Sequence, residues 1–283
     1  MLVDLPSLVQ PIREIALAAG REIMAIYRAE FTVSEKEDRS PLTEADLVAH
    51  ERILAELTAL TPDIPVISEE AKTIPLSARR HWEWLWLVDP LDGTREFIKR
   101  NDEFSVNIAL IHHHEPVLGL ILMPVTGVCY FAHRQSGAFK QPLDHAPARI
   151  HTRRVNRAKV RVACSRAAYQ GRRLQTYLQY LGEHHHLSVG SALKSCLVAE
   201  GKADLYPRFG PTCEWDTAAA QIIVEQAGGR LTDMHMQPMQ YNARPTLINP
   251  DFFAFGDLKH DWSQYLPDRK PGSALSDHAL RTL

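Results

Sequence analysis

The first sixty residues carry apolar side chains at three- and four-residue steps, a spacing that predicts two amphipathic helices. One helix is expected over residues 7–29 and the other over residues 43–60, with a polar stretch between them. Beyond residue 60 the apolar residues gather in short runs, at 65–68 and 84–88, which are typical of buried strands.

Strand patterns then follow one another without an intervening helix. Residues 104–110 alternate between large apolar and smaller or polar side chains, so we expect one face of this strand to be buried. Three more strands are expected at 117–122, 128–132 and 137–140. Strands that arrive in series favour an antiparallel sheet over strict alternation with helices.

A turn-rich basic stretch near residue 150 divides the chain. We predict an α+β half over residues 1–150, an α/β half over 151–257, and a polar, weakly ordered tail over 258–283. In the second half strands and helices alternate. The expected strands are 160–164, 187–189, 203–208 and 230–232, and the expected helices are 171–181, 192–200 and 216–227.

Composition narrows the class of protein. The 283 residues are 45% hydrophobic and 23% charged, with a net charge of −2, so no broadly basic surface for nucleic acid is expected. Four scattered cysteines without a CxxC pair argue against zinc and disulfides, and fit a reducing cytoplasm. No transmembrane segment is expected, because no apolar run approaches about 18 residues. Peripheral attachment to the cytoplasmic face of the inner membrane stays open.

The strongest chemical signal is DPLDGT, which follows the apolar run at 84–88. Asp89 ends the strand and Asp92 follows a turn, so both carboxylates and the Leu91 carbonyl can converge on one cation. Oxygen ligands of this kind suit Mg²⁺ or Mn²⁺. Gly93 permits close backbone approach, and Thr94 opens a short helix whose free amides suit a phosphate.

Three other segments carry acidic residues in similar settings: Glu69 in ISEE, Asp216 in EWDTAAA and Asp46 in TEAD. Each has an ordinary alternative, since acidic residues commonly cap helices or occupy their first turn. Taken together they favour one site, to which several segments each bring a carboxylate.

The segments PLTEAD, VISEE, WLVDPLDGT and EWDTAAA, in this order and spacing, resemble the lithium-sensitive, magnesium-dependent inositol monophosphatase superfamily over about residues 10–257. Within it, GSALK at 190–194, LVAEGKADLYPRFGPT at 197–212 and the choice of Leu91 resemble the bisphosphate nucleotidase branch. The resemblance implies a layered αβαβα sandwich, the sugar-phosphatase fold.

It also implies a reaction: hydrolysis of the 3′-phosphate of adenosine 3′,5′-bisphosphate to AMP and phosphate, linked to sulfur assimilation. The sulfated relative of that nucleotide is a further expected substrate. Two or more Mg²⁺ ions are implied, with Mn²⁺ as a substitute. Inositol monophosphatase activity and a non-catalytic nucleotide- or metal-binding role remain as alternatives, and the chain could be a monomer or a homodimer.

The resemblance assigns roles to individual residues. Asp46 and Thr94 would orient and deprotonate the attacking water, with Glu69 as a further catalytic residue. The implied metal ligands are Glu69, Asp89, the Leu91 carbonyl, Asp92 and Asp216. The implied substrate contacts are Gly93, Thr94, Gly190, Ser191, Lys194, Arg208 and Glu214. For Lys194 a solvated helix position is the alternative.

Overall fold

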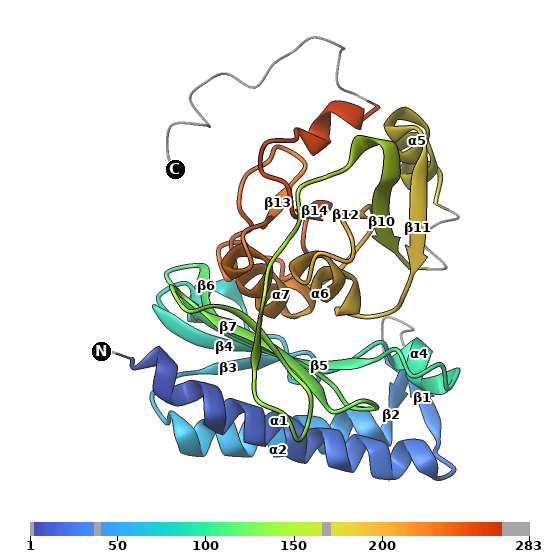
Figure 1. Cartoon of the computed structure of the whole chain (residues 1–283). Helices are drawn as coiled ribbons and strands as arrows, with labels where there is room; N and C mark the ends of the chain where they lie inside the picture. Colours follow the sequence, from blue (N-terminus) through green and yellow to red (C-terminus); the bar gives the residue numbers. More distant parts are fainter. Residues whose placement is uncertain (1–2, 37–40, 166–170, 268–283) are drawn as a thin grey trace.

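The computed structural model describes residues 3–36, 41–165 and 171–267. Helices and sheets alternate in five layers (Figure 1): a helix pair, a seven-stranded sheet, a second helix pair, a five-stranded sheet and an outer helix. The layered αβαβα sandwich is therefore confirmed.

The first layer consists of α1 (Leu5–Arg28) and α2 (Glu44–Leu60), which lie side by side beneath the larger sheet. Both helices match the predicted ranges. Their apolar faces, with Ile12 and Ile23 of α1 fully buried, pack against the sheet and form its lower core. The short strands β1 (Val33–Glu35) and β2 (Pro41–Thr43) pair between the two helices.

The seven strands of the larger sheet lie in chain order, and every neighbouring pair is antiparallel except β3–β4. This confirms the predicted series. The strands are β3 (Val66–Ser68), β4 (Trp84–Asp92), β5 (Ser105–His112), β6 (Glu115–Met123), β7 (Val128–His133), β8 (Gly137–Gln141) and β9 (Ala148–Ile150). Two short helices, α3 (Leu76–Arg79) and α4 (Thr94–Ile98), lie in the connections on either side of β4.

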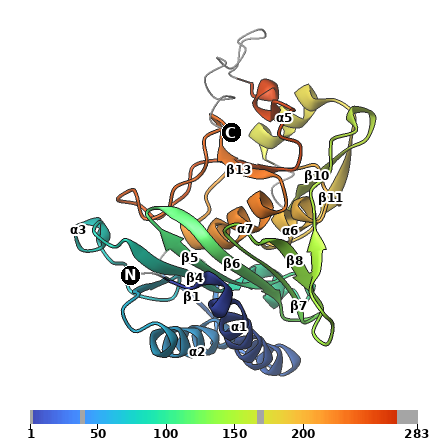
Figure 2. The same cartoon turned by 60° about the vertical axis from the view of Figure 1, so that its left-hand side comes forward.

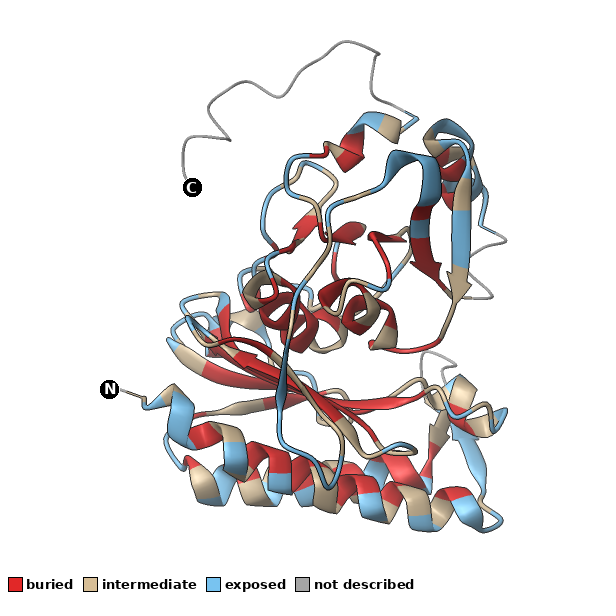
Figure 3. Ribbon diagram, in the orientation of Figure 1, coloured by how far each residue is buried: buried red, intermediate tan, exposed pale blue. Residues whose placement is uncertain are grey.

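The expectation of one buried face on β5 is wrong, because both faces of this strand are covered (Figure 3). Val106, Ile108 and Leu110 pack toward α1 and α2, whereas Ala109 and Ile111 pack toward α7 (Glu214–Gln226) on the other face. A strand between two helix layers has no solvent face, so alternation in its sequence does not separate inside from outside.

The smaller sheet has the order β11-β10-β12-β14-β13 and is mixed: β10 runs parallel to β11 and β12, and the other pairs are antiparallel. Its strands are β10 (Val160–Cys164), β11 (His184–Ser188), β12 (Leu205–Arg208), β13 (Arg230–Asp233) and β14 (Phe252–Phe255). As Figure 2 shows, α6 (Leu193–Ala199) and α7 lie between the two sheets. The outer layer consists of α5 (Arg172–Leu181), with the single-turn helices η1 (Arg157–Lys159) and η3 (Trp262–Tyr265) nearby.

The prediction of a weakly ordered tail from residue 258 is wrong for its first ten residues. Trp262 of η3 is fully buried in the outer core, and its carbonyl accepts a hydrogen bond from the Tyr177 hydroxyl at 2.8 Å. Residues 268–283 lie outside the described part of the chain. The predicted division near residue 150 falls between β9 and β10, but one apolar core joins both halves. Their separation into domains therefore stays a prediction.

Among the described residues, no helix combines the length and the apolar character needed to cross a bilayer.

Candidate active site

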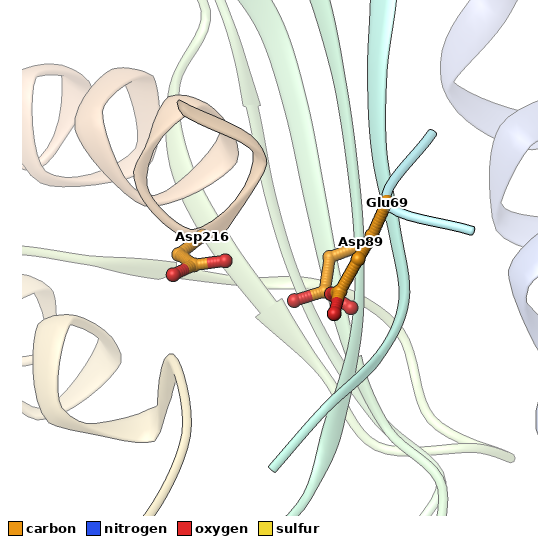
Figure 4. A group of neighbouring side chains, drawn as sticks. All are labelled: Glu69, Asp89 and Asp216. Carbon is orange, nitrogen blue, oxygen red and sulfur yellow. The ribbon is translucent and has the colours of Figure 1, made fainter. Parts of the chain in front are cut away.

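Three carboxylates from three segments meet where α7 faces the larger sheet (Figure 4). Glu69 follows β3, Asp89 belongs to β4, and Asp216 lies in the first turn of α7. One oxygen of each side chain lies within 4.8 Å of the others. The structure thus brings together three of the predicted ligands, from both halves of the chain.

Local backbone geometry places these acids. The parallel register sets Ser68 opposite Val88, and the Glu69 amide donates to the Val88 carbonyl at 3.1 Å, so Glu69 lies beside Asp89. The pairing of β4 with β5 shifts register between Asp89 and Asp92. This irregularity of the DPLD segment lets two nearby residues of one strand approach the same site.

Burial and mutual repulsion disfavour the ionised forms of these carboxylates when no cation is bound. Burial and then the neighbouring carboxylates of Glu69, Asp92 and Asp216 raise the pKa of Asp89 well above its ordinary range. Burial, followed by the charge of Asp92, raises the pKa of Asp216 to about 8. Burial also raises the pKa of Asp92, although the Lys194 ammonium opposes this.

Such a group of oxygen donors fits a hard divalent cation. A buried cluster of carboxylates without an equal number of nearby cations would hold protons at neutral pH, and a bound cation would replace those protons. The ligand atoms available are carboxylate oxygens, which Mg²⁺, Ca²⁺ and Mn²⁺ prefer to imidazole or thiolate. Of the residues that the structure describes, Glu69, Asp89 and Asp216 are the group able to hold a metal.

Asp46 and Thr94 form the predicted pair. Thr94 Oγ1 donates to Asp46 Oδ1 at 3.0 Å and lies 3.4 Å from the Leu91 carbonyl oxygen. The other oxygen of Asp46 accepts from the Thr43 amide at 2.8 Å and from its hydroxyl at 2.6 Å. Burial raises the pKa of Asp46, and these hydrogen bonds oppose the rise. Asp46 thus caps α2 through one oxygen and accepts from Thr94 through the other, while the role of this pair in activating water stays a prediction.

Lys36 is a neighbour that the sequence analysis missed. Its Nζ lies 2.6 Å from Glu69 Oε1 and 2.6 Å from Glu70 Oε1. Burial disfavours the Lys36 ammonium, but both carboxylates outweigh this and raise its pKa. The only signal in the sequence is its place in the polar stretch SEKED, which carries no pattern that could locate it.

The segment predicted to hold the nucleotide starts beside Asp92. The Ala192 amide donates to the Asp92 carboxylate, and the Gly190 amide donates to Glu103 Oε2 at 2.8 Å. Lys194 is only 5% exposed, and its Nζ donates to the Ser191 carbonyl at 2.6 Å. The expectation of a solvated helix position for Lys194 is therefore wrong, while its contact with substrate stays a prediction.

The two remaining candidate substrate contacts, Arg208 and Glu214, lie in different surroundings. Arg208, at the end of β12, acts electrostatically on Asp216 and lowers its pKa, so it lies near the cluster. Glu214 is fully buried, and its carboxylate accepts from the Asn242 amide at 2.6 Å and pairs with Arg244 at 3.6 Å. A substrate contact from Glu214 stays a prediction and would require this cluster to rearrange.

A cavity of about 840 Å³ lies elsewhere, at the C-terminal half of α7. Its lining includes Glu115, Arg134, Glu225 and Arg230 but none of the candidate site residues. The size of this cavity therefore does not identify the candidate active site. The carboxylate cluster does.

Comparisons with known proteins agree with this geometry. The family model described as "Inositol monophosphatase family" matches residues 4–260. The 3′(2′),5′-bisphosphate nucleotidase CysQ of Escherichia coli strain K12 is 46% identical over 84% of this chain and 96% of its own length. The protein of the same name from Haemophilus influenzae is 40% identical over 88% and 92%. The crystal structure of CysQ from Bacteroides thetaiotaomicron superimposes with a TM-score of 0.77, at 39% identity over 90% of this chain and 98% of that one.

Proposed function

The chain belongs to the inositol monophosphatase family, and from that premise we propose that it is a magnesium-dependent 3′(2′),5′-bisphosphate nucleotidase. Its substrate is adenosine 3′,5′-bisphosphate, from which it removes the 3′-phosphate to leave AMP. The nucleotidase relatives, at 38–46% identity over most of the chain, support this choice over an inositol phosphate.

One observation carries the proposal: a cluster of buried and half-buried carboxylates lies near a threonine whose hydroxyl is already held by an aspartate. A protein that only binds a metal or a nucleotide has no need of the second feature. Phosphate monoesters hydrolyse extremely slowly in water, so an enzyme must both neutralise the charge of the phosphate and activate a water molecule. The site offers groups for both tasks.

Glu69, Asp89, Asp92, Asp216 and the Leu91 carbonyl would hold the ions. When bound, Mg²⁺ supplies positive charge to the phosphate and lowers the pKa of water. The protein's own contribution is to fix these oxygens on three segments, two of which follow or end strands of the larger sheet. Lys36 contributes further positive charge at the edge of the same cluster.

The water is activated by the Thr94–Asp46 pair. Because the Thr94 hydroxyl donates its hydrogen to Asp46, its lone pairs are free to accept a proton from an attacking water. The Asp46 carboxylate, held by Thr43, receives the Thr94 proton in turn. The water oxygen forms a bond to phosphorus, and the bond from phosphorus to the nucleotide 3′-oxygen breaks. The departing 3′-oxygen then takes up a proton.

The residues that bind the nucleotide lie in the second half of the chain. Lys194 acts electrostatically on Asp92 and Arg208 acts on Asp216, so positive charge lies near both carboxylates, and Gly190 and Ser191 belong to the same segment as Lys194. A bisphosphate carries a second anionic group that needs such cations, whereas an inositol monophosphate does not. The Gly93 and Thr94 amides contact the phosphate that is removed.

Cys129, Cys164 and Cys196 are buried free thiols. Thiols that stay reduced are typical of the cytoplasm, where we place the enzyme.

The test is phosphate release from adenosine 3′,5′-bisphosphate and from inositol 1-phosphate at equal concentrations, with Mg²⁺ and with EDTA. We expect release that requires Mg²⁺ and strongly favours the nucleotide. A preference for the inositol ester would keep the mechanism and overturn the substrate. Folded protein that releases phosphate from neither would refute the enzyme and favour a binding role.

A further inference from the structure

Strand β5 buries two polar side chains beside the carboxylates, in an otherwise apolar stretch. Ser105 and Asn107 are 0% and 1% exposed. In the register of β4 with β5, Ser105 lies opposite Asp92 and Asn107 lies opposite Asp89. By alternation with Ala109, both polar side chains lie on the face that carries the site. Burying an amide is costly unless it hydrogen-bonds, so this placement calls for a reason.

Ser105 determines how the Asn107 amide is oriented. Its hydroxyl has one hydrogen and lies 3.1 Å from Asn107 Oδ1 and 3.4 Å from Asp92 Oδ2, so it donates to the nearer Asn107 oxygen while lying close to Asp92. With Oδ1 accepting from Ser105, the amide nitrogen must point away from it. Among the described residues this buried nitrogen has no hydrogen-bond partner of normal geometry. Asp92 is the carboxylate within its reach, because the Ser105 hydroxyl that holds Asn107 also lies 3.4 Å from Asp92 Oδ2, and the Asn107 side chain makes a weaker hydrogen-bond contact with Asp92.

We propose that Asn107 is a positioning residue for the metal site: its amide donates to Asp92, and Ser105 fixes the amide in the donating orientation. One carboxylate oxygen of Asp92 thereby accepts a hydrogen bond from the amide, and the other oxygen stays available to the cation. The inference rests on the metal site of the proposed function, and it adds two residues that neither bind the ion nor touch the substrate.

A neutral donor suits this task better than a cation would. An amide hydrogen bond orients the Asp92 carboxylate without adding positive charge that would repel Mg²⁺. The hydrogen bond also limits rotation of the Asp92 carboxylate, so less conformational entropy is lost when the ion binds. Partners that orient a metal ligand in this way typically change metal affinity by about 10- to 100-fold when they are replaced.

The test uses Asn107→Leu, which keeps the size of the side chain and removes the donor. Mg²⁺ is titrated into the metal-free protein by calorimetry, so the readout does not depend on turnover. We expect binding weaker by about 10- to 100-fold. Ser105→Ala should weaken binding in the same direction but less, because the amide is then free to flip. Since Ser105 acts through Asn107, the double variant should bind no more weakly than Asn107→Leu alone.

The matched control is Ile108→Val, a change to the adjacent residue on the opposite face of β5. It should lower the unfolding midpoint and leave Mg²⁺ affinity unchanged. Wild-type affinity in Asn107→Leu, or additive losses in the double variant, would overturn the inference. If Asn107→Leu does not fold, Ser105→Ala alone decides, and unchanged affinity in that variant would overturn it. Absence of Mg²⁺ binding by the wild-type protein would instead refute the metal site of the proposed function.

Discussion

The carboxylates of Asp46 and Asp216 each take part in a helix cap and in the candidate active site. Asp46 accepts from Thr43 through one oxygen and from Thr94 through the other. Asp216 accepts from the Cys213 amide at 2.9 Å and still belongs to the metal-binding group. A capping carboxylate is already oriented by the backbone, so less ordering is required when it acquires a second partner.

Replacing Thr94 tests the water-activating pair. Thr94→Ala removes the hydroxyl that Asp46 orients, so we expect kcat to fall by about 10²- to 10⁴-fold. Mg²⁺ affinity should change little, because the Thr94 side chain is not among the predicted ligands. The measurement is steady-state phosphate release at saturating Mg²⁺, accompanied by calorimetric Mg²⁺ titration.

Thr94→Ser provides the comparison, since it keeps the hydroxyl and should retain most of the rate. Equal losses in the Ala and Ser variants would mean that the methyl group matters rather than the hydroxyl. An Ala variant with nearly normal kcat would remove Thr94 from the mechanism.

At the scale of single residues, the sequence predicted the site residues that lie in recognisable motifs. It did not predict the residues that only tertiary packing brings close to the site. Asp89, Glu69 and Asp216 could be proposed because each follows or opens a recognisable element. Lys36 lies in a polar stretch without periodicity, and Asn107 sits in a strand where its alternation suggested a solvent-facing side. Their roles come from neighbours distant in the chain, which a single sequence does not reveal.

Among the elements, α7 packs closely against the larger sheet. A Cβ built on Gly119 of β6 would come within 2.6 Å of Ile222 and 2.7 Å of the Ala219 carbonyl oxygen. Only a residue without a side chain lets the helix approach this closely. The position of Gly119 therefore sets the distance between the sheet, which carries Asp89, and the helix, which carries Asp216.

Gly119→Ala should therefore affect both stability and the metal site. The added methyl group meets backbone that cannot rotate away, so we expect a loss of about 1–3 kcal/mol in the free energy of unfolding. Mg²⁺ binding should weaken as well, because Asp216 moves with α7. Denaturant unfolding and Mg²⁺ titration measure the two effects.

Gly20→Ala is the matched change in α1. There the added methyl group meets the end of the flexible Leu122 side chain at 2.7 Å, and helix propensity favours Ala. We expect a smaller effect on stability and none on Mg²⁺ binding. The role assigned to Gly119 would fail if both variants bound Mg²⁺ as the wild type does.

Most helices and strands could be predicted from periodicity, and the exceptions have physical causes. β9 has three residues within a basic, turn-rich stretch, which is too short for alternation to be seen. β14, with the sequence FFAF, is buried on both faces and so lacks alternation altogether. The residues around Trp262 looked like a polar tail because one buried aromatic side chain leaves no periodic pattern.

For the whole molecule, buried charge makes stability depend on pH. Glu225 of α7 lines the cavity at the far end from the cluster, and burial raises its pKa from an ordinary 4.5 to about 7. The folded protein therefore holds a proton that the unfolded chain releases near pH 4.5. The contribution of Glu225 to the free energy of unfolding therefore falls as pH rises from about 4.5 to 7, and the loss is complete above that range.

Glu225→Gln should remove this loss. At pH 8 we expect the variant to be more stable than the wild type by about 1–3 kcal/mol, with little difference near pH 4.5. Denaturant unfolding at the two pH values measures the effect. The exposed Glu30→Gln change is the control and should show no such dependence on pH. Equal stabilisation at both pH values would point to packing instead of ionisation.

The shared core also predicts how the two halves behave when they are separated. One face of the larger sheet packs on α7 through Leu87, Ala109 and Ile121, so a fragment of residues 1–150 would expose these side chains. We expect that fragment to aggregate or to bind a hydrophobic dye, and the fragment 151–267 to suppress this when both are produced together. A monomeric, cooperatively unfolding 1–150 fragment would establish independent domains.

The position of α7 in the chain has a consequence for synthesis on the ribosome. All seven strands of the larger sheet have been made by Ile150, yet the helix that covers one of its faces begins only at Glu214. During that interval the nascent protein carries an uncovered apolar sheet and a half-assembled group of acids. The last of the three carboxylates, Asp216, arrives on the same helix that covers the sheet, so a single late docking step both hides the apolar face and completes the group of acids.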